Sequence, residues 1–252
     1  MTVINEYQAP AQCLANRIIL ITGAGDGIGA AVAKSCARHG ATVILVGRTV
    51  AKLEQVYDDI VNTGGPQPAI IPLELTGASP EDYTNIAELI DKEFGRLDGL
   101  LHNAAQLGAR MPFEQYDHTL WNKVMQVNLN APFLLTQACL PLLKKSADAS
   151  IIFTTADVGR HGRAYWGAYA IANAAIENMM QILADELETN TAIRVNSIDP
   201  GAVRTAMRRA AFPAEDFEAL KTPAEIVNGY LYLFGADSKG KTGQQFSLSS
   251  PS

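Results

Sequence analysis

The sequence lacks an excess of basic residues and a long apolar run. Its 20 lysines and arginines stand against 26 aspartates and glutamates, so the formal net charge is -6. This balance argues against a broad basic surface for nucleic acid or for an anionic membrane. No apolar stretch approaches the roughly 20 residues that a membrane-spanning helix needs. We therefore expect a small-molecule partner, and neither nucleic acid nor a membrane.

Cysteine is scarce. Cys13, Cys36 and Cys139 are far apart and form no CxxC pair, which is typical of free thiols in a reducing compartment. The first ten residues have neither a basic start nor an apolar run, so the sequence shows no secretory signal. We therefore expect a cytoplasmic protein.

Apolar residues make up 48% of the 252 residues, which is enough for one large core. Short apolar runs alternate with segments of helical spacing, as in buried parallel strands joined by crossover helices. The expected strands are 17–22, 42–46, 69–73, 99–102, 151–154, 194–198 and 245–248. The expected helices are 29–39, 51–62, 80–94, 119–143, 169–188 and 224–234. The sequence thus predicts an α/β fold in which one domain, residues 1–252, holds a doubly wound seven-stranded parallel sheet with helices on both faces.

The segment 201–223 is long for a connection in such a fold, and it contains Pro213 and Pro223. Long ordered loops are usually lids or binding loops. We therefore interpret this segment as a lid over the substrate, and the alternative is an ordinary surface excursion.

A glycine-rich turn directly follows the first apolar run and opens a helix. It contains Gly23, Gly25, Gly27 and Gly29. Glycines permit the tight turn and let the backbone approach a pyrophosphate, while the helix N-terminus supplies amide donors. This context predicts a Rossmann-type dinucleotide site. Asp26 in the same turn is either a cofactor contact or an acid that caps the turn.

The end of the second strand indicates which dinucleotide binds. An acid at this position bonds the ribose 2′-hydroxyl of NAD, whereas an arginine accommodates the 2′-phosphate of NADP. Arg48 follows the second strand, and no carboxylate does. NADP(H) is therefore the preferred cofactor, with NAD(H) as the alternative.

The spacing of Gly23, Gly27 and Gly29 resembles the short-chain dehydrogenase/reductase family, and later landmarks extend the resemblance along nearly the whole chain. Segments 204–208 and 221–226 are most similar to one subgroup of bacterial oxidoreductases in that family. The resemblance implies reversible hydride transfer between a nicotinamide cofactor and a carbonyl or alcohol. It also implies cofactor contacts by Ile28, Glu74, Leu75, Asn103, Ala104, Ala105, Tyr169, Asn173, Pro200, Gly201, Val203 and Thr205.

Two positions depart from the family pattern around the cofactor. Glu74 stands where aspartate is usual beside the adenine, and His102 replaces an asparagine. No second histidine, cysteine or carboxylate has a ligand-like spacing to His102. We therefore expect no metal site.

The resemblance implies a catalytic tetrad of asparagine, serine, tyrosine and lysine. Asn128 and Tyr169 are retained, but Ala156 stands at the serine position and Asn173 at the lysine position. Without the lysine charge the tyrosine pKa stays nearer its free value, and without the serine a donor to the substrate oxygen is missing. Thr155 is an alternative hydroxyl if a bulge shifts the strand by one residue.

Several residues just before Tyr169 have two interpretations. Arg160, His161 and Arg163 are interpreted as a solvated basic loop, and positive charge beside the substrate is the alternative. Tyr165 and Trp166 are interpreted as residues that pack in the core or in a dimer interface, and the alternative is that they form an aromatic wall around the substrate.

Together these observations favour an NADP(H)-binding oxidoreductase with a degraded tetrad and weak or atypical activity. The alternative is a catalytically impaired nucleotide-binding protein that acts as a sensor or scaffold, and a third option is non-redox chemistry in the same pocket. Helices 119–143 and 169–188 carry more apolar surface, including Met179, Met180 and Leu183, than one sheet face covers. They predict a homodimer or homotetramer formed through these helices.

Overall fold

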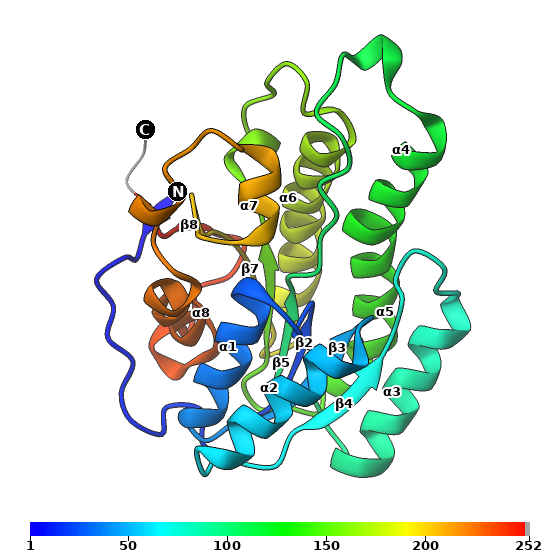
Figure 1. The fold of residues 1–252 in the computed structure, drawn as a ribbon. Helices are drawn as coiled ribbons and strands as arrows, with labels where there is room; N and C mark the ends of the chain where they lie inside the picture. The colour runs from blue at the N-terminus through cyan, green and yellow to red at the C-terminus, as the bar shows by residue number, and fades with distance from the viewer. Residues whose placement is uncertain (250–252) are drawn as a thin grey trace.

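The computed structural model describes residues 1–249 of the chain. Within them, eight strands form one sheet in the order β1-β8-β7-β6-β5-β2-β3-β4, and neighbouring strands run parallel (Figure 1). The strands are β1 (Thr2–Val3), β2 (Ile18–Thr22), β3 (Thr42–Gly47), β4 (Ala69–Pro72), β5 (Gly99–His102), β6 (Ser150–Thr154), β7 (Arg194–Asp199) and β8 (Gln245–Ser247). The predicted doubly wound parallel sheet is confirmed. The sequence pattern missed β1, because two residues are too few to form an apolar run.

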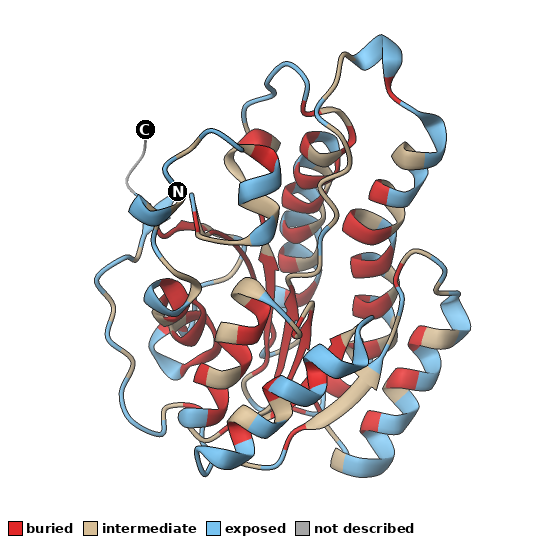
Figure 2. Ribbon diagram, viewed as in Figure 1, coloured by how far each residue is buried: buried red, intermediate tan, exposed pale blue. Residues whose placement is uncertain are grey.

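Helices cover both faces of the sheet. They are α1 (Gly27–Arg38), α2 (Val50–Asn62), α3 (Pro80–Phe94), α4 (His118–Met125), α5 (Ala131–Leu143), α6 (Gly167–Glu188), α7 (Ala206–Ala211) and α8 (Val227–Phe234). Helices α1, α2 and α8 share one apolar core, which includes Leu53 and Tyr230, and α3, α5 and α6 share the other, which includes Tyr83. Figure 2 shows the central strands as buried between these two layers. None of the helices in residues 1–249 is long and apolar enough to span a membrane.

The strand order reverses between β2 and β5. From β2 the sheet continues through β3 to β4, and from β5 it continues in the opposite direction through β6 and β7 to β8. In open α/β sheets a ligand binds in the crevice outside the carboxyl ends of the strands at such a reversal. The fold therefore gathers the turn after β2, the loop after β5 and the start of α6 around one crevice.

The predicted helix 119–143 is divided into α4 and α5 by a π-helical turn at Gln126–Asn130. Turns of this kind are rare and occur frequently at functional sites. Asn128 lies inside the turn and is buried. The side chain that the sequence assigns to the tetrad thus lies at a break in the regular helix.

The segment 201–223 is folded back on itself and contains α7, a short helix that the sequence pattern did not predict. Arg204 Nη1 donates to Glu218 at 2.7 Å. Arg208 donates to the two carboxylate oxygens of Glu215 at 2.5 and 2.6 Å. These two ion pairs link α7 and the residues before it to the second half of the segment.

Of the three apolar residues of α6 that the sequence assigns to an association surface, one is buried in the core and two are partly buried against it. Met180 is fully buried, and Met179 and Leu183 pack against the same core cluster. They face inward because α6 covers the sheet along most of its length. The helices do expose other apolar side chains, including Phe133 on α5 and Ile182 on α6, with exposed fractions of 50% and 51%.

Candidate active site

A large cavity of about 1150 Å³ lies at the carboxyl end of the sheet. Such a volume exceeds the roughly 300–1,000 Å³ of an ordinary small-molecule pocket and suits a dinucleotide together with a substrate. Of the predicted site residues, Gly29 alone does not line this cavity. Residues that are up to about 180 positions apart in the sequence, such as Gly23 and Thr205, thus contribute to one site.

Gly29 is the last glycine of the glycine-rich turn 22–29, which we call the phosphate turn, and it allows the turn to pack closely. A Cβ atom at this position would lie 2.2 Å from the carbonyl oxygen of Gly23. No side chain fits at that distance, so glycine is needed for the close approach of α1 to the end of β2. The N-terminus of α1 therefore lines the cavity, where the amides that follow the capped Gly27 are available to an anion.

Asp26 is a helix cap and an ion-pair partner. Its Oδ1 accepts a hydrogen bond from the Gly27 amide at 2.7 Å, and Lys52 Nζ lies 2.5 Å from its Oδ2. The bond from Lys52 is the main reason that the pKa of Asp26 is lowered. Lys52 compensates the one acidic charge of the phosphate turn, so this charge does not oppose a bound phosphate.

Arg48 lines the cavity directly after the end of β3, and its side chain is 73% exposed. The nearest carboxylate is that of Glu74, with 4.0 Å between Arg48 Nη1 and Glu74 Oε2. Glu74 also accepts a hydrogen bond from the Thr76 hydroxyl at 3.0 Å. Most of the Arg48 guanidinium therefore remains free to bind a phosphate at the end of β3.

Thr22 joins the ends of β2 and β5, a role that the sequence did not indicate. Its Oγ1 accepts hydrogen bonds from the amides of Asn103 at 3.0 Å and Ala104 at 3.1 Å. The same hydroxyl donates to the Leu101 carbonyl at 3.2 Å. These bonds fix the segment 102–105 as the floor of the cavity, where the sequence places the cofactor.

Thr205 brings the segment after β7 against the phosphate turn. A Cβ atom at Gly27 would lie 3.4 Å from Thr205 Cγ2, so the two residues are close neighbours. Thr205 Oγ1 accepts a hydrogen bond from the Arg208 amide at 3.1 Å and caps α7. Because the hydroxyl acts as an acceptor in this bond, its own proton stays available to a ligand.

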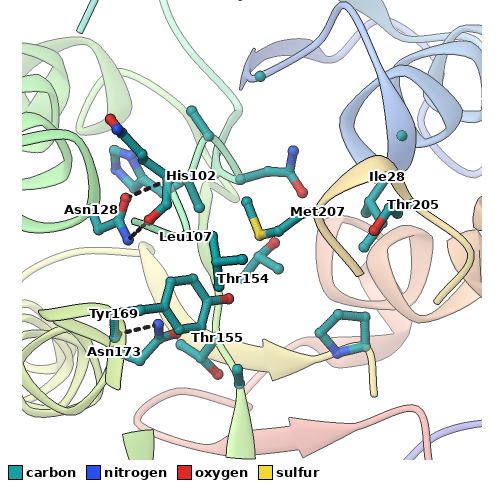
Figure 3. A pocket seen from close by; sticks show the side chains of 18 of the residues that line it. Ile28, His102, Leu107, Asn128, Thr154, Thr155, Tyr169, Asn173, Thr205 and Met207 are labelled. Atoms are coloured by element: carbon teal, nitrogen blue, oxygen red, sulfur yellow. Dashed lines mark hydrogen bonds between the residues drawn. The ribbon is translucent and has the colours of Figure 1, made fainter. Parts of the chain in front are cut away.

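Tyr169 projects into the middle of the cavity from the first turn of α6, opposite Met207 of α7 (Figure 3). Burial raises the pKa of Tyr169 to about 12. The amide of Asn173 acts in the opposite direction, and the carboxylates of Asp199 and Asp157 raise the pKa further. At neutral pH the phenol is therefore protonated and can donate its proton.

Asn173 and Ala156 flank Tyr169 without contributing a charge. Asn173 Nδ2 donates to the backbone carbonyl of Tyr169 at 2.8 Å, one helical turn away (Figure 3). Ala156 lines the cavity and packs with apolar neighbours that include Trp166. The two positions thus offer an amide and a methyl group beside the phenol.

Thr155 directs its hydroxyl away from Tyr169 and into a buried ionic network. Its Oγ1 donates to Glu177 Oε1 at 2.8 Å. Glu177 also accepts from Ser197 at 2.6 Å and from Arg160 at 3.2 Å, and Arg160 pairs with Asp199 as well. The strand shows no shift that would present the Thr155 hydroxyl to a substrate.

Asn128 is held by the loop after β5. Its Oδ1 accepts from the Gln106 amide at 2.8 Å, and its Nδ2 donates to the Gln106 carbonyl at 2.9 Å (Figure 3). This reciprocal pair fixes the π-helical turn against the cavity wall. Asn128 therefore positions the loop in addition to lining the cavity.

His102 is a core histidine at the end of β5. Its ring stacks on Phe153 with 4.8 Å between centroids, and its Nε2 is 2.8 Å from the Thr136 hydroxyl. Burial lowers the pKa of His102 to about 3, so the ring is neutral. Residues 1–249 contain no group of three histidine, cysteine, aspartate or glutamate side chains that could hold a metal ion.

Comparison with known proteins finds close relatives. The family described as short chain dehydrogenase matches residues 17–216. The uncharacterized oxidoreductase YciK of Escherichia coli (strain K12) is 51% identical over 240 residues, which cover 95% of this chain and 94% of YciK.

Solved structures of similar proteins have the same fold. A short chain dehydrogenase from Pseudomonas syringae is 52% identical with a TM-score of 0.95, and the match covers 97% of this chain and 99% of the other. A short chain dehydrogenase from Escherichia coli CFT073, complexed with NADPH, is 52% identical with a TM-score of 0.92. That match covers 96% of this chain and 100% of the other.

Proposed function

Because this chain belongs to the short chain dehydrogenase family, as its sequence predicts, we propose that it binds NADP(H) and interconverts a carbonyl compound and an alcohol. Its similarity to YciK agrees with the subgroup that segments 204–208 and 221–226 indicate. The proposal rests above all on the cavity that joins the phosphate turn to Tyr169. A protein of this family that is complexed with NADPH supports the choice of cofactor.

The residues of the cavity fit NADP(H), a dinucleotide that carries a pyrophosphate and a 2′-phosphate. The amides at the start of α1 bind the pyrophosphate, and Arg48 binds the 2′-phosphate with a guanidinium that is mostly free. Thr205 donates to the carboxamide of the nicotinamide. When bound, the reduced nicotinamide supplies the hydride.

Tyr169 donates the proton in the direction of carbonyl reduction. When a hydride is transferred to the carbonyl carbon of the substrate, Tyr169 would give its phenol proton to the carbonyl oxygen, and the resulting phenolate would regain a proton from solvent. The pKa of about 12 keeps Tyr169 protonated before each turnover. Asn128, Ala156 and Asn173 complete a degraded tetrad, and we propose that the missing serine and lysine make the activity weak.

Segment 201–223 is proposed to act as the substrate lid. Met207 of α7 faces Tyr169 across the cavity, which supports this assignment (Figure 3). The unpaired state of Cys13, Cys36 and Cys139 supports a reducing compartment, and we propose the cytoplasm.

The proposed cofactor leads to a first prediction. Arg48→Ala should weaken NADPH binding by about 10- to 100-fold, since a hydrogen-bonded charge typically contributes about 1.5–3 kcal/mol. NADH, which lacks the 2′-phosphate, should bind with nearly unchanged affinity. Calorimetric titration of the natural chain, of Arg48→Ala and of Lys92→Ala measures both effects.

Lys92→Ala is the matched control, because it removes one exposed positive charge from α3, away from the cavity. Tighter binding of NADH than of NADPH by the natural chain would contradict the cofactor assignment. NADPH binding without turnover on any carbonyl compound would favour the sensor or scaffold alternative over the reductase.

We also propose a homodimer or homotetramer formed through α4, α5 and α6. The supporting observation is the pair of exposed side chains Phe133 and Ile182 on the outer faces of α5 and α6. Sedimentation at micromolar concentration should show an oligomer for the natural chain and a monomer for Phe133→Glu with Ile182→Glu. Leu89→Glu on α3 is the control, as Leu89 is 57% exposed on another helix. A natural chain that sediments as a monomer would refute this assembly.

A further inference from the structure

The cavity continues beyond Tyr169 into an apolar compartment. Its wall belongs to a separate hydrophobic cluster at the carboxyl end of the sheet. The members of that cluster which line the cavity are Leu107, Ala156, Val158, Trp166, Tyr169, Ala211 and Phe212. The methyl group of Ala156 is thus part of a continuous apolar surface next to the phenol.

Trp166 is turned into this compartment by an unusual backbone. Tyr165 has a φ of +73°, which a non-glycine residue rarely adopts, and Gly167 has a φ of +35°. As a result, Tyr165 is 56% exposed while Trp166 is only 8% exposed. Strained backbone of this kind is concentrated at functional sites. The turn separates two adjacent aromatics and sends one of them to the substrate side of the cavity.

The aromatic wall is held rigidly. The Trp166 ring lies 5.7 Å from Phe212 and 5.8 Å from Tyr169 between centroids. The guanidinium of Arg110 is 4.8 Å from the Trp166 centroid and 4.9 Å from the Phe212 centroid, and it also donates to the Ala211 carbonyl. Since these contacts connect the loop after β5, the start of α6 and the end of α7, the wall is organised before a ligand binds.

The arginines that line this end of the cavity already have acidic partners. Arg160, whose side chain is 16% exposed, lies between Glu177 and Asp199. Arg163 lies 2.6 Å from Asp157. A carboxylate or phosphate on the substrate would have to compete with these carboxylates for its cation.

The third arginine is neutralised in the same way. Arg208 lies 2.5 Å from Glu215, and its guanidinium stacks on Phe212 at 3.8 Å from the ring centroid. His161 also lines the cavity, and it is exposed. The compartment therefore combines an apolar wall with three arginines that are paired with carboxylates. Arg110 has no carboxylate partner, but it does not line the cavity, and its guanidinium lies against the Trp166 and Phe212 rings and donates to the Ala211 carbonyl.

We propose that the substrate is an uncharged carbonyl compound with a flat apolar body that packs on Trp166 and Phe212 and directs its carbonyl oxygen to Tyr169. This substrate class rests on the proposed function of the same site. It follows from the aromatic wall, which favours apolar contact, and from the paired arginines, which do not favour an anion.

Binding of two matched ketones to the protein saturated with NADP⁺ tests the proposal without any turnover. Acetophenone is flat and neutral, and 4-acetylbenzoate is the same ketone with a carboxylate. By calorimetry, acetophenone should bind at least roughly tenfold more tightly, because the carboxylate would lose its hydration without gaining a free cation. Trp166→Leu and Phe212→Leu should each weaken acetophenone binding by about two- to tenfold, the range of one aromatic contact.

Trp121→Leu is the control, since Trp121 is the other of the two tryptophans and lies outside the cavity, against Phe113 and Tyr116. Unchanged NADP⁺ affinity shows that each variant is folded. Equal or tighter binding of 4-acetylbenzoate, or full acetophenone affinity in both cavity variants, would overturn the substrate class. Failure of the natural chain to bind NADP⁺ would instead overturn the proposed function.

Discussion

Ala156→Ser combined with Asn173→Lys is expected to raise kcat for carbonyl reduction by at least about 10²- to 10³-fold, the typical value of one hydrogen-bond donor to a reacting oxygen. Serine restores that donor at a position where the cavity wall now presents a methyl group. Lysine places a positive charge one helical turn from Tyr169, where the Asn173 amide now bonds the backbone. Because both groups act on one proton transfer, the fold increase in kcat of the double variant should exceed the product of the fold increases of the two single variants.

The measurement is steady-state kinetics of the natural chain, both single variants and the double variant on neutral aryl ketones. NADPH affinity should change little, since Arg48 and the phosphate turn lie at the other end of the cavity. Tyr169→Phe added to the double variant should abolish the gain, which shows that the gain passes through the phenol. A natural chain that is already fast, with a double variant that is no faster, would contradict the idea that the tetrad is impaired.

The pH dependence of the reverse reaction is a second test of how residue 173 acts on Tyr169. Alcohol oxidation needs the Tyr169 phenolate as base. Because the pKa of Tyr169 is raised to about 12, the phenolate fraction at lower pH grows about tenfold with each unit of pH increase. Oxidation by the natural chain should therefore rise throughout the alkaline range. Asn173→Lys should move this rise to lower pH by about one to three units, since a neighbouring cation favours the charged phenolate. An unchanged profile would exclude electrostatic contact between position 173 and the phenol.

Arg160→Met should destabilise the protein by about 3–5 kcal/mol, because it leaves the buried carboxylates of Glu177 and Asp199 without their cation. The exposed fractions of these two side chains are 6% and 8%, so water does little to compensate for the loss. Arg163→Met, three residues away, should cost at most about 1 kcal/mol, since its pair with Asp157 is half exposed.

Urea unfolding of the natural chain and of the two methionine variants distinguishes these values through the transition midpoints. Both substitutions replace an arginine by an unbranched apolar side chain in the same loop, so they differ mainly in the burial of the lost partner. An equal decrease in the free energy of unfolding in the two variants would show that the network around Glu177 contributes no more to stability than a surface ion pair does.

The parts of the site that depend on local sequence could be predicted, and those that depend on distant contacts could not. The glycine turn, Arg48 and Tyr169 each follow a strand or open a helix, and their position relative to that element fixes where they lie. The sequence also indicated that Asp26 is either a cap or a cofactor contact. Its hydrogen bond to the neighbouring Gly27 amide is a local cap, whereas its ion pair with Lys52, which is 26 residues away in the chain, left no signal in the sequence.

The interpretations of the loop before Tyr169 were limited in the same way. The sequence favours a solvated basic loop at Arg160, but its side chain is only 16% exposed, because Glu177 and Asp199 contact it from α6 and β7. Tyr165 and Trp166 were interpreted together, although one left-handed residue sends them to different environments. Neither a buried ion pair nor a positive φ at tyrosine leaves a periodic signal in the sequence.

Strand β1 is the edge strand on one side of the sheet, and its shortness limits how copies of the chain can aggregate. A long edge strand with unpaired peptide groups is a template for further strands, and proteins avoid this with very short edge strands or with proline. Here the outer strand on one side has two residues, and the outer strand on the other side, β4, ends in Pro72. Neither margin offers a regular row of donors and acceptors, so cross-β growth from the native state is disfavoured. Removing residues 1–4 would uncover β8 and should increase fibril formation on prolonged incubation.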